Sequence, residues 1–514
     1  MCRLGIPVFL SCEVLPEVRE FERTSTTAVC AYVGPILESY LTQLETAVTD
    51  LGLPNLHIMG STGGVFDVKE ALRVPVNSIE SGPAAGVIAA QLIGSQINEP
   101  DLISFDMGGT TAKASLIRDG EIEITAEYEV GGSGSQNRWV TGTGHPIRVP
   151  VIDLAEVSAG GGSIAWVDPA GSLRVGPGSA GAEPGPVCYG QGGTEPTVTD
   201  ANLVLGYLDA NSLLDGGLPI DYNRAVQALA DKIGNPMNMD TQTAAAAIRE
   251  IVNNGMAEAL RIVSIERGHD PREFCLVAFG GAGPLHAAAL AEELEIPRVI
   301  VPPIPGGFSA LGLVGTDVRR DYARTLYQPL SDLAARDISA VWSELIAEGK
   351  RMLKESGIPA SRWQFQRSAD LRYTRQAYEL NVTADEGEFT TTAKDQLADR
   401  FHARHKQTYG HQNPNEPVHL VTLRLTAVGK LDRLEITHRP DPIGNSEKSR
   451  RSAWFADAGT VECAVHDRSR LNATSRLTGP AIVESLDSTL VIPPGWSASN
   501  DQRGFITMER HHNG

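Results

Sequence analysis

Residues 101–120 of this 514-residue chain read DLISFDMGGTTAKASLIRDG. The apolar runs 102–105 and 112–117 are typical of buried strands, and the glycine-containing turn 106–110 joins them. A second turn at 119–120 closes the return strand. The stretch therefore predicts a β-hairpin whose connecting turn is built from small residues.

The turn of this hairpin has residue types suited to phosphate. It contains two glycines and two threonines, which are Gly108, Gly109, Thr110 and Thr111. Glycines let backbone N–H groups approach a phosphate without a Cβ in the way, and threonines add hydroxyl donors. Asp106 at the strand end can hold a hydrated Mg²⁺, and Lys113 can offset phosphate charge. The alternative is a glycine-rich hairpin with an aspartate cap, because the turn is neither a Walker A loop nor a Rossmann turn.

A second glycine segment, residues 280–284, follows the strand-like run 274–279 and precedes the expected helix 285–294. Its small residues leave room for a flat ligand, and a helix N-terminus favours negative charge. The candidate ligand-binding residues are Gly280, Gly281 and Gly283. Taken alone, the segment fits a tightly packed strand-to-helix turn at least as well.

A third glycine segment follows the polar pair Asp153 and Glu156, and it consists of Gly160, Gly161 and Gly162. Three consecutive glycines cost conformational entropy, so they indicate a close backbone approach to a ligand or to another segment. The Gly- and Pro-rich stretch 176–199 cannot be a regular helix or a central strand. It predicts a long ordered loop of the kind that often carries function.

The predicted pattern of secondary structure differs between two parts of the chain. From 101 to 317, apolar strand-like runs alternate with helical patterns, among them an amphipathic helix over 243–268, which predicts an α/β layer structure. Beyond residue 320 the pattern predicts an α+β part, with helices at 338–357 and 392–409, strands at 369–382, 418–428, 460–465 and 481–492, and a polar loop at 441–451.

Composition excludes several classes of function. The net charge of −19 argues against nucleic-acid or anionic-membrane partners, because the protein's field repels both. The six cysteines are widely spaced, which supports neither a zinc knuckle nor a disulfide scaffold. No apolar run predicts a membrane span, and a cytoplasmic protein is expected.

His402, His405 and His411 suggest a metal site, but a solvated helix end is favoured because no carboxylate stands at a complementary offset.

A series of segments along the chain can be compared with known families. They include SCEVLPEVREFERTSTTAVCAY, MGSTGGV, SIESGPAAGV, SFDMGGTTAKASL, the block from SAGGGSIAWVDP to TVTDANLVLG, FGGAGPLHA, PPIPGGFSALGLVGTDVRRDYART, LRYTRQAYEL and GPAIVESLDSTLVIPPGW. Taken together, these segments resemble the hydantoinase A/oxoprolinase family, which includes subunits of acetone and acetophenone carboxylases. The matching segments are long and collinear, and they cover essentially the whole chain.

The resemblance implies an α/β fold with an actin/Hsp70-like (RNase-H-like) ATPase lobe and an α+β C-terminal domain. The implied domains are 1–325, with the phosphate and nucleoside motifs in 96–325 after an N-terminal remainder at 1–95, and 326–514. It makes 106–111 a phosphate hairpin for ATP and Mg²⁺, with Asp106 and Lys113 as candidate catalytic residues and Asp106 as the metal ligand. It also places 280–284 at the nucleoside.

The resemblance further implies ATP-driven phosphorylation of a carbonyl oxygen. The expected function is a subunit of a cyclic-amide hydrolase acting on hydantoin, 5-oxoproline or a similar small lactam. The alternatives are a ketone carboxylase subunit and a catalytically silent scaffold. A B-type subunit is the expected partner. Relatives carry a further DxGGTxTD hairpin near their start, which these 514 residues lack. Two explanations are open: the sequence is a fragment or the product of a split gene, or a separate polypeptide supplies that lobe.

Overall fold

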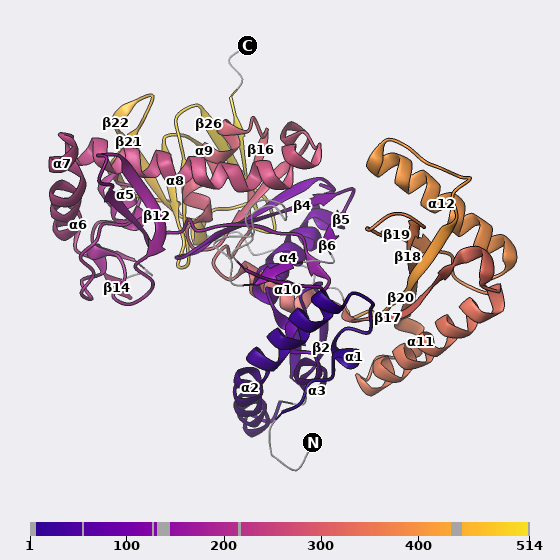
Figure 1. Ribbon diagram of the computed structural model, residues 1–514. Helices are drawn as coiled ribbons and strands as arrows, with labels where there is room; N and C mark the ends of the chain where they lie inside the picture. The colour runs from indigo at the N-terminus through magenta and orange to yellow at the C-terminus, as the bar shows by residue number, and fades with distance from the viewer. Residues whose placement is uncertain are drawn as a thin grey trace.

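The computed structural model describes residues 7–53, 56–125, 128–130, 144–213, 217–432 and 445–511. Within these ranges the chain is a mixed α/β protein built on one nine-stranded sheet, one six-stranded sheet and one four-stranded sheet (Figure 1). The α/β class predicted from the sequence is therefore confirmed. No helix in the described ranges is both long and apolar enough to cross a membrane.

The nine-stranded sheet contains the predicted hairpin, whose two strands are the second and third from one edge. Its strands in spatial order are β10 (Ala155–Val157), β4 (Ala112–Arg118), β3 (Leu102–Met107), β15 (Cys275–Phe279), β16 (Arg298–Val301), β27 (Ile506–Arg510), β26 (Trp496–Asn500) and β23 (Arg476–Thr478), with β5 (Glu121–Ile122) beside β4. Strand β3 pairs antiparallel with β4 and parallel with β15. This register places Asp106 opposite Lys113 on one side and Phe279 on the other.

Helices cover both faces of this sheet, as expected where parallel strands are buried. One face meets α5 (Val198–Val204), α8 (Thr241–Val263) and α9 (Gly283–Glu293), and the other meets α4 (Ser81–Ile97) and α10 (Phe308–Gly315). Alternate residues divide between the two cores, since Phe105 belongs to the first and Leu102 to the second. Because both faces are filled, the sheet holds the end of β3 rigidly.

The six-stranded sheet forms a second body on the other side of the α4 and α10 helices (Figure 1). Its strands in order are β1 (His57–Met59), β2 (Val65–Asp67), β17 (Val318–Pro329), β20 (Val418–Gly429), β18 (Trp363–Tyr373) and β19 (Leu380–Ala384). Helices α11 (Ala335–Glu355) and α12 (Thr391–Tyr409) pack on it, around buried Trp342 and Phe401. The N-terminal helices are α1 (Ser11–Val14), α2 (Glu20–Asp50) and α3 (Val68–Arg73).

The C-terminal part contributes to both bodies. Residues up to 432 complete the six-stranded sheet, whereas β27 returns to pair antiparallel with β16 of the nine-stranded sheet. The four-stranded sheet consists of β21 (Glu447–Phe455), β22 (Gly459–Asp467), β24 (Ala481–Glu484) and β25 (Thr489–Ile492). The loop predicted at 441–451 is wrong for 447–451, where β21 pairs with β22 and turns its polar side chains outward as an edge strand does. Residues 441–444 lie outside the described ranges.

Helices α4 and α10 cross so closely that Gly312 cannot carry a side chain. A Cβ at this position would overlap the carbonyl oxygen of Ala85, which is backbone and cannot move aside. We expect Gly312→Ala to lower the free energy of unfolding by about 3 kcal/mol, a typical cost of overpacking. Thermal or urea unfolding measures this loss.

The matched control is Gly255→Ala on α8, where a Cβ would meet nothing within 4 Å. That exchange should instead raise stability by up to about 1 kcal/mol, because alanine is the better helix former. Equal stabilities for the two variants would contradict the close crossing of α4 and α10.

Candidate functional site

The turn between β3 and β4 is held from one side by the glycine segment 160–162. A Cβ on Gly160 would lie 2.6 Å from the carbonyl carbon of Gly109, so only glycine fits there. The N–H of Gly161 donates to the carbonyl oxygen of Gly108 at 3.0 Å. The N–H of Gly162 donates to the carbonyl oxygen of Gly109 at 2.6 Å. The two carbonyls of the turn therefore point toward this segment.

The segment 280–283 meets the same turn from the other side. The N–H of Ala282 donates to the carbonyl oxygen of Met107 at 3.0 Å. Gly280 has a φ of +81°, and a Cβ there would overlap the Met107 carbonyl and lie 2.5 Å from Oδ1 of Asp106. Glycine is thus required at 280 by its backbone conformation and by its neighbours. The structure brings all three glycine segments found in the sequence to one point.

Asp106 stands at this meeting point, near the C-terminal end of β3, with its side chain half-buried. Burial raises the pKa of the Asp106 carboxyl, whereas the nearby charge of Lys113 and a hydrogen bond with Ser309 of α10 lower it. A desolvated carboxylate gains more from a cation placed beside it than an exposed one does. The position therefore suits a carboxylate that pairs with a cation.

Lys113 lies beside the turn, but its charge is already compensated. Its Nζ is 2.7 Å from Oε2 of Glu80 and 3.5 Å from Oε2 of Glu156. Glu80 has a φ of +60° at the start of α4, an uncommon conformation for a residue with a side chain. The sequence pattern gave no sign of this pairing, because Glu80 and Glu156 come from segments far apart in the chain. The ammonium acts on this site together with two carboxylates.

The outer side of the turn is open. Gly108 and Gly109 do not have positive φ, and a Cβ on either would meet nothing within 4 Å in the described structure. Within the same ranges, the N–H groups of Gly109 and Thr110 donate to no acceptor. Neither backbone strain nor packing explains these two glycines. Free N–H groups in an open glycine turn can bind an anion such as phosphate.

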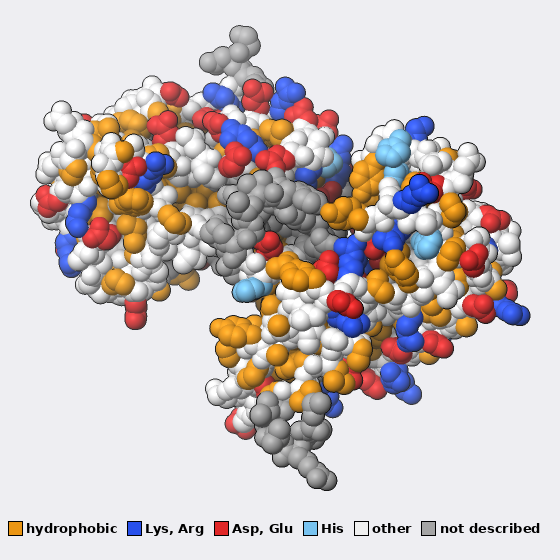
Figure 2. All heavy atoms as spheres, viewed as in Figure 1, with side chains coloured by type: hydrophobic (Ala, Val, Ile, Leu, Met, Phe, Trp, Pro, Cys, Tyr) orange, Lys and Arg blue, Asp and Glu red, His pale blue; other side chains and the backbone are white. Residues whose placement is uncertain are grey.

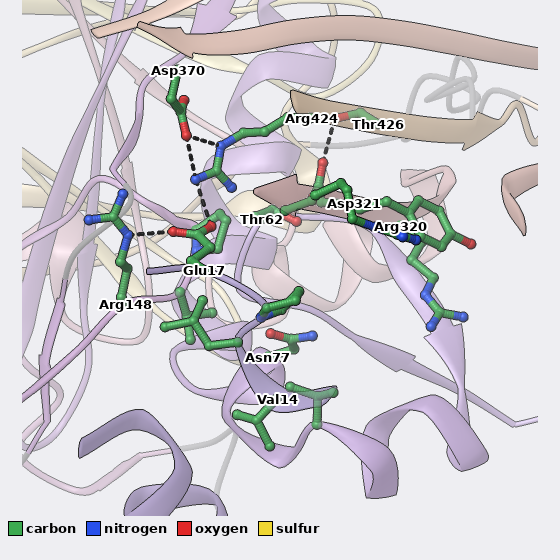
Figure 3. A pocket seen from close by; sticks show the side chains of 18 of the residues that line it. Val14, Glu17, Thr62, Asn77, Arg148, Arg320, Asp321, Asp370, Arg424 and Thr426 are labelled. Atoms are coloured by element: carbon green, nitrogen blue, oxygen red, sulfur yellow. Dashed lines mark hydrogen bonds and ion pairs between the residues drawn. The ribbon is translucent and has the colours of Figure 1, made fainter. Parts of the chain in front are cut away.

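A cavity of 1380 Å³ lies between the N-terminal helices and the six-stranded sheet (Figure 3). Figure 3 shows Glu17 between two arginines: its carboxylate is 2.6 Å from Nε of Arg148 and 2.7 Å from Nη2 of Arg424. Arg424 also contacts Asp370 at 2.7 Å. The surface of the cavity is about half polar and half apolar, these charges are paired with one another, and Asp106 does not line it. Sequence reasoning missed it, because its walls come from segments hundreds of residues apart.

Comparison with known proteins decides the family. The hydantoinase/oxoprolinase profile matches residues 23–322, more than half of the chain, and the profile of the hydantoinase/oxoprolinase C-terminal domain matches residues 330–511. The chain belongs to the hydantoinase/oxoprolinase family. The resemblance drawn from the sequence is thereby confirmed.

Several relatives of this hydantoinase/oxoprolinase chain are similar along nearly its whole length. An uncharacterised protein of Methanocaldococcus jannaschii is 43% identical, and the match spans 98% of this chain and 73% of that protein. The caprolactamase subunit alpha of Pseudomonas jessenii is 33% identical, over 100% of this chain and 73% of its own. The acetone carboxylase beta subunit of Xanthobacter autotrophicus is 28% identical, over 96% of this chain and 69% of its own.

Two solved structures share the fold. The ATP-dependent caprolactamase of Pseudomonas jessenii superposes with a TM-score of 0.81 at 33% identity, over 99% of this chain and 74% of that one. Nucleotide-free acetone carboxylase also superposes with a TM-score of 0.81, at 26% identity, over 98% of this chain and 71% of that one. Both titles describe ATP-dependent enzymes.

His286, which follows the glycine segment 280–283 in this family member, is a structural residue. It is fully buried, its Nδ1 is 2.7 Å from Oδ1 of Asn253, and its Nε2 is 3.2 Å from Nδ2 of Asn202. An amide oxygen accepts and an amide nitrogen donates, so the ring is neutral with its proton on Nδ1. Burial also lowers the pKa of His286. This histidine holds α9 against α8 and has no access to a ligand.

The expected solvated helix end near the end of α12 is wrong for His405 but fits His411, which is exposed; His402 is half-buried. His405 is fully buried, with its Nδ1 2.7 Å from the carbonyl oxygen of His411. Nδ1 of His402 is 2.7 Å from the hydroxyl of Tyr373. The rings of Tyr373 and Phe401 pack on His405, which explains its burial. No group of three metal-ligating side chains occurs in the described ranges, here or at Asp106.

Cysteine reactivity offers a check on the packing around the cavity. Of the five cysteines in the described ranges, all free, Cys12 is exposed and lines the cavity. Burial raises the pKa of Cys30 to about 11 and that of Cys275 to about 12. We expect maleimide at pH 8 to modify Cys12 first, and Cys30 about 100-fold more slowly because so little of it is thiolate. Peptide mass spectrometry over time measures both rates, and equal rates would contradict this arrangement.

Proposed function

We propose that this chain is the ATP-handling subunit of an enzyme that hydrolyses cyclic amides. The observation that carries the proposal is the meeting of the glycine segments 160–162 and 280–283 around an open glycine turn, with Asp106 beside it and free N–H groups facing outward. The whole-chain similarity to caprolactamase subunit alpha supports this choice of reaction. In this proposal the nine-stranded sheet is one lobe of an actin/Hsp70-like ATPase.

The proposed phosphate site is the turn itself. The N–H groups of Gly109 and Thr110 would bind phosphate oxygens, with the hydroxyls of Thr110 and Thr111 beside them. Segment 160–162 orients the turn, because its N–H groups donate to the carbonyl oxygens of Gly108 and Gly109. The N–H groups of Gly109 and Thr110, which are trans to these carbonyls, therefore face outward. Segment 280–283 would lie at the nucleoside. Glycine at 160 and 280 keeps these supports close to the turn.

Asp106 fits a Mg²⁺ ion that accompanies the nucleotide. Mg²⁺ usually binds through one or two carboxylates, phosphate oxygens and water, so a single half-buried carboxylate beside a phosphate turn is sufficient. The ion would supply positive charge to the phosphates. Lys113 is proposed as a positioning residue: it neutralises Glu80 and Glu156, whose charges would otherwise repel a nucleotide.

The proposed reaction activates the carbonyl oxygen of the ring. That oxygen attacks the γ-phosphorus of ATP, a new P–O bond forms, and the bond to the β-phosphate oxygen breaks to release ADP. The carbon of the phosphorylated amide is then a good electrophile. Water adds to it, and the ring C–N bond breaks with a proton passing to nitrogen, which leaves an acyl phosphate. A second water hydrolyses this acyl phosphate to a carboxylate and free phosphate. This chain would contribute positioning and charge compensation to the first step.

Partners are part of the proposal. The caprolactamase relative is named subunit alpha, the acetone carboxylase relative is named a beta subunit, and the acetophenone carboxylase relative is named a gamma subunit. We propose that a B-type subunit associates with this chain and completes the hydrolytic step. The alternative reaction, carboxylation of a ketone, would use the same proposed ATP site, and the fold shared with acetone carboxylase is the observation that favours it.

Phosphate release by the complex purified with its own partners tests the proposal. Caprolactam, 5-oxoproline and hydantoin are compared with acetone plus bicarbonate as stimulants of ATP hydrolysis. We expect one cyclic amide to raise the rate about 10-fold or more, and to yield one open-chain product per phosphorylation event. Stimulation by the ketone alone would favour the carboxylase. No stimulation by any compound would leave the scaffold role.

A further inference from the structure

The C-terminal part of the chain reaches the proposed nucleoside segment. The turn 485–488, between β24 and β25, packs on the loop 304–307 that precedes α10: Oδ2 of Asp487 accepts a hydrogen bond from the N–H of Gly306 at 2.7 Å. The hydroxyl of Ser485 donates to the other oxygen of Asp487 at 3.0 Å, which fixes the turn. A Cβ on Gly306 would lie 2.9 Å from Cβ of Asp487, so glycine is needed for this contact.

The loop before α10 also connects the two ends of the proposed ATP site. The N–H of Gly280 donates to the carbonyl oxygen of Pro305 at 2.9 Å. Ser309, a few residues later, makes the hydrogen bond with Asp106 at the phosphate end. The turn 485–488 is therefore tied to the nucleoside segment through one short loop.

Two large aliphatic side chains are exposed where these segments meet. Leu486 at the tip of the turn is 66% exposed, and Ile304 at the start of the loop is 54% exposed. Gly281, in the neighbouring glycine segment, is also exposed, and in the described structure a Cβ there would meet only the carbonyl oxygen of Asp487, at 3.7 Å. Exposed aliphatic surface next to a glycine without a side chain suits a flat, apolar-faced ligand.

We propose that Leu486 and Ile304 form the wall that contacts the base of the nucleotide, opposite Gly281. The proposal rests on the proposed ATP site and adds to it a base-binding part supplied by the C-terminal segment. A heteroaromatic base covers exposed aliphatic surface with its face, whereas a bare polyphosphate does not. The apolar wall should therefore affect nucleotides and leave polyphosphate binding unchanged.

Calorimetric titration with Mg-ATP and with Mg-tripolyphosphate tests the wall. We expect Leu486→Ala, which removes an exposed side chain and should not disturb folding, to weaken ATP binding about 10-fold. Gly281→Val should weaken ATP binding at least as much, because the added side chain would occupy the space beside residue 281 in which we propose that the base lies. Neither variant should change tripolyphosphate affinity. The matched control is Leu51→Ala, an equally exposed leucine at the end of α2 (76%), which should change neither affinity.

The outcomes separate the inference from the proposed function. Unchanged ATP affinity in Leu486→Ala and Gly281→Val, with the unaltered chain binding ATP, would overturn the base wall and leave the phosphate site standing. Equal losses for ATP and tripolyphosphate would also overturn it, because the effect would then lie on the phosphates. No binding of either ligand by the unaltered chain would contradict the proposed ATP site itself.

Discussion

Asp106→Asn should reduce ATP turnover about 100-fold or more while the fold stays intact. Asparagine has the same shape as aspartate but lacks the charge that Mg²⁺ requires. The amide can still accept the Ser309 hydrogen bond, so the local packing should persist. Steady-state ATP hydrolysis and melting temperature, measured on the same sample, check the two halves of this expectation.

The pKa of Asp106 fixes the sign of its effect on stability. Because burial raises the folded-state pKa of this carboxyl, its ionised form destabilises the folded protein as pH rises through that pKa. Asp106→Asn should therefore leave stability at neutral pH equal or slightly higher. Turnover of the unaltered enzyme should fall on acidification at a higher pH than an ordinary aspartate would give.

The control is Asp119→Asn, at the far end of the same hairpin. Asp119 has a φ of 53° and an 85% exposed side chain, and asparagine tolerates this conformation well. Turnover of this variant should equal that of the unaltered protein. Full turnover in Asp106→Asn would remove Asp106 from the site.

Gly109→Val should abolish detectable ATP binding, a loss of about 100-fold or more, without unfolding the protein. Among the described residues there is open space for the new side chain, since a Cβ at 109 meets none of their atoms within 4 Å. A bound phosphate would occupy that space, and the branched side chain would keep it away from the N–H groups. Equilibrium binding of a fluorescent ATP analogue and thermal unfolding measure the two effects.

Valine substitutions at two other glycines serve as comparisons for Gly109→Val. Gly255→Val on α8 adds the same side chain in equally open space and should leave binding unchanged. Gly160→Val should instead destabilise the protein, because its Cβ would lie 2.6 Å from backbone atoms of the turn. If Gly109→Val binds ATP normally, the turn is a glycine-rich hairpin without a phosphate, which was the alternative left open by the sequence.

Local sequence pattern was sufficient for the hairpin and its neighbours. The runs 102–105 and 112–117 appear as β3 and β4, although β3 continues through Met107. The helix predicted at 243–268 appears as α8, which ends at Val263, with Gly268 at a positive φ beyond it. These elements were predictable because the spacing of apolar residues and the positions of glycines reflect structure within a few residues of the chain.

Contacts between distant segments were beyond the sequence. Nothing in the pattern near Lys113 indicates Glu80 or Glu156, and nothing in the C-terminal strands indicates that β27 returns to β16. The meeting of the glycine segments at Asp106 also depends on sheet order. The sequence pattern indicated that the glycine segments make close backbone contacts, but only the fold shows that these contacts are with one another.

The histidines of α12 show the same limit. The spacing of these histidines and the polar residues around them indicated a solvated helix end, yet Tyr373 of β18 and Phe401 of the same helix enclose His405. At His405, tertiary burial replaced the water that the local pattern predicted. The cavity beside Glu17 was missed for a related reason, because strands and helices from both halves of the chain form it.

Calorimetric titration of Mg-ATP into this chain, with and without its partners, tests the central claim most directly. We predict one ATP bound per chain in the unaltered protein and in Gly255→Val, and none in Gly109→Val or Asp106→Asn at the same concentrations. Identical binding in all four proteins would place the nucleotide elsewhere. No binding by the unaltered chain, even with its partners present, would contradict the claim that this turn holds ATP.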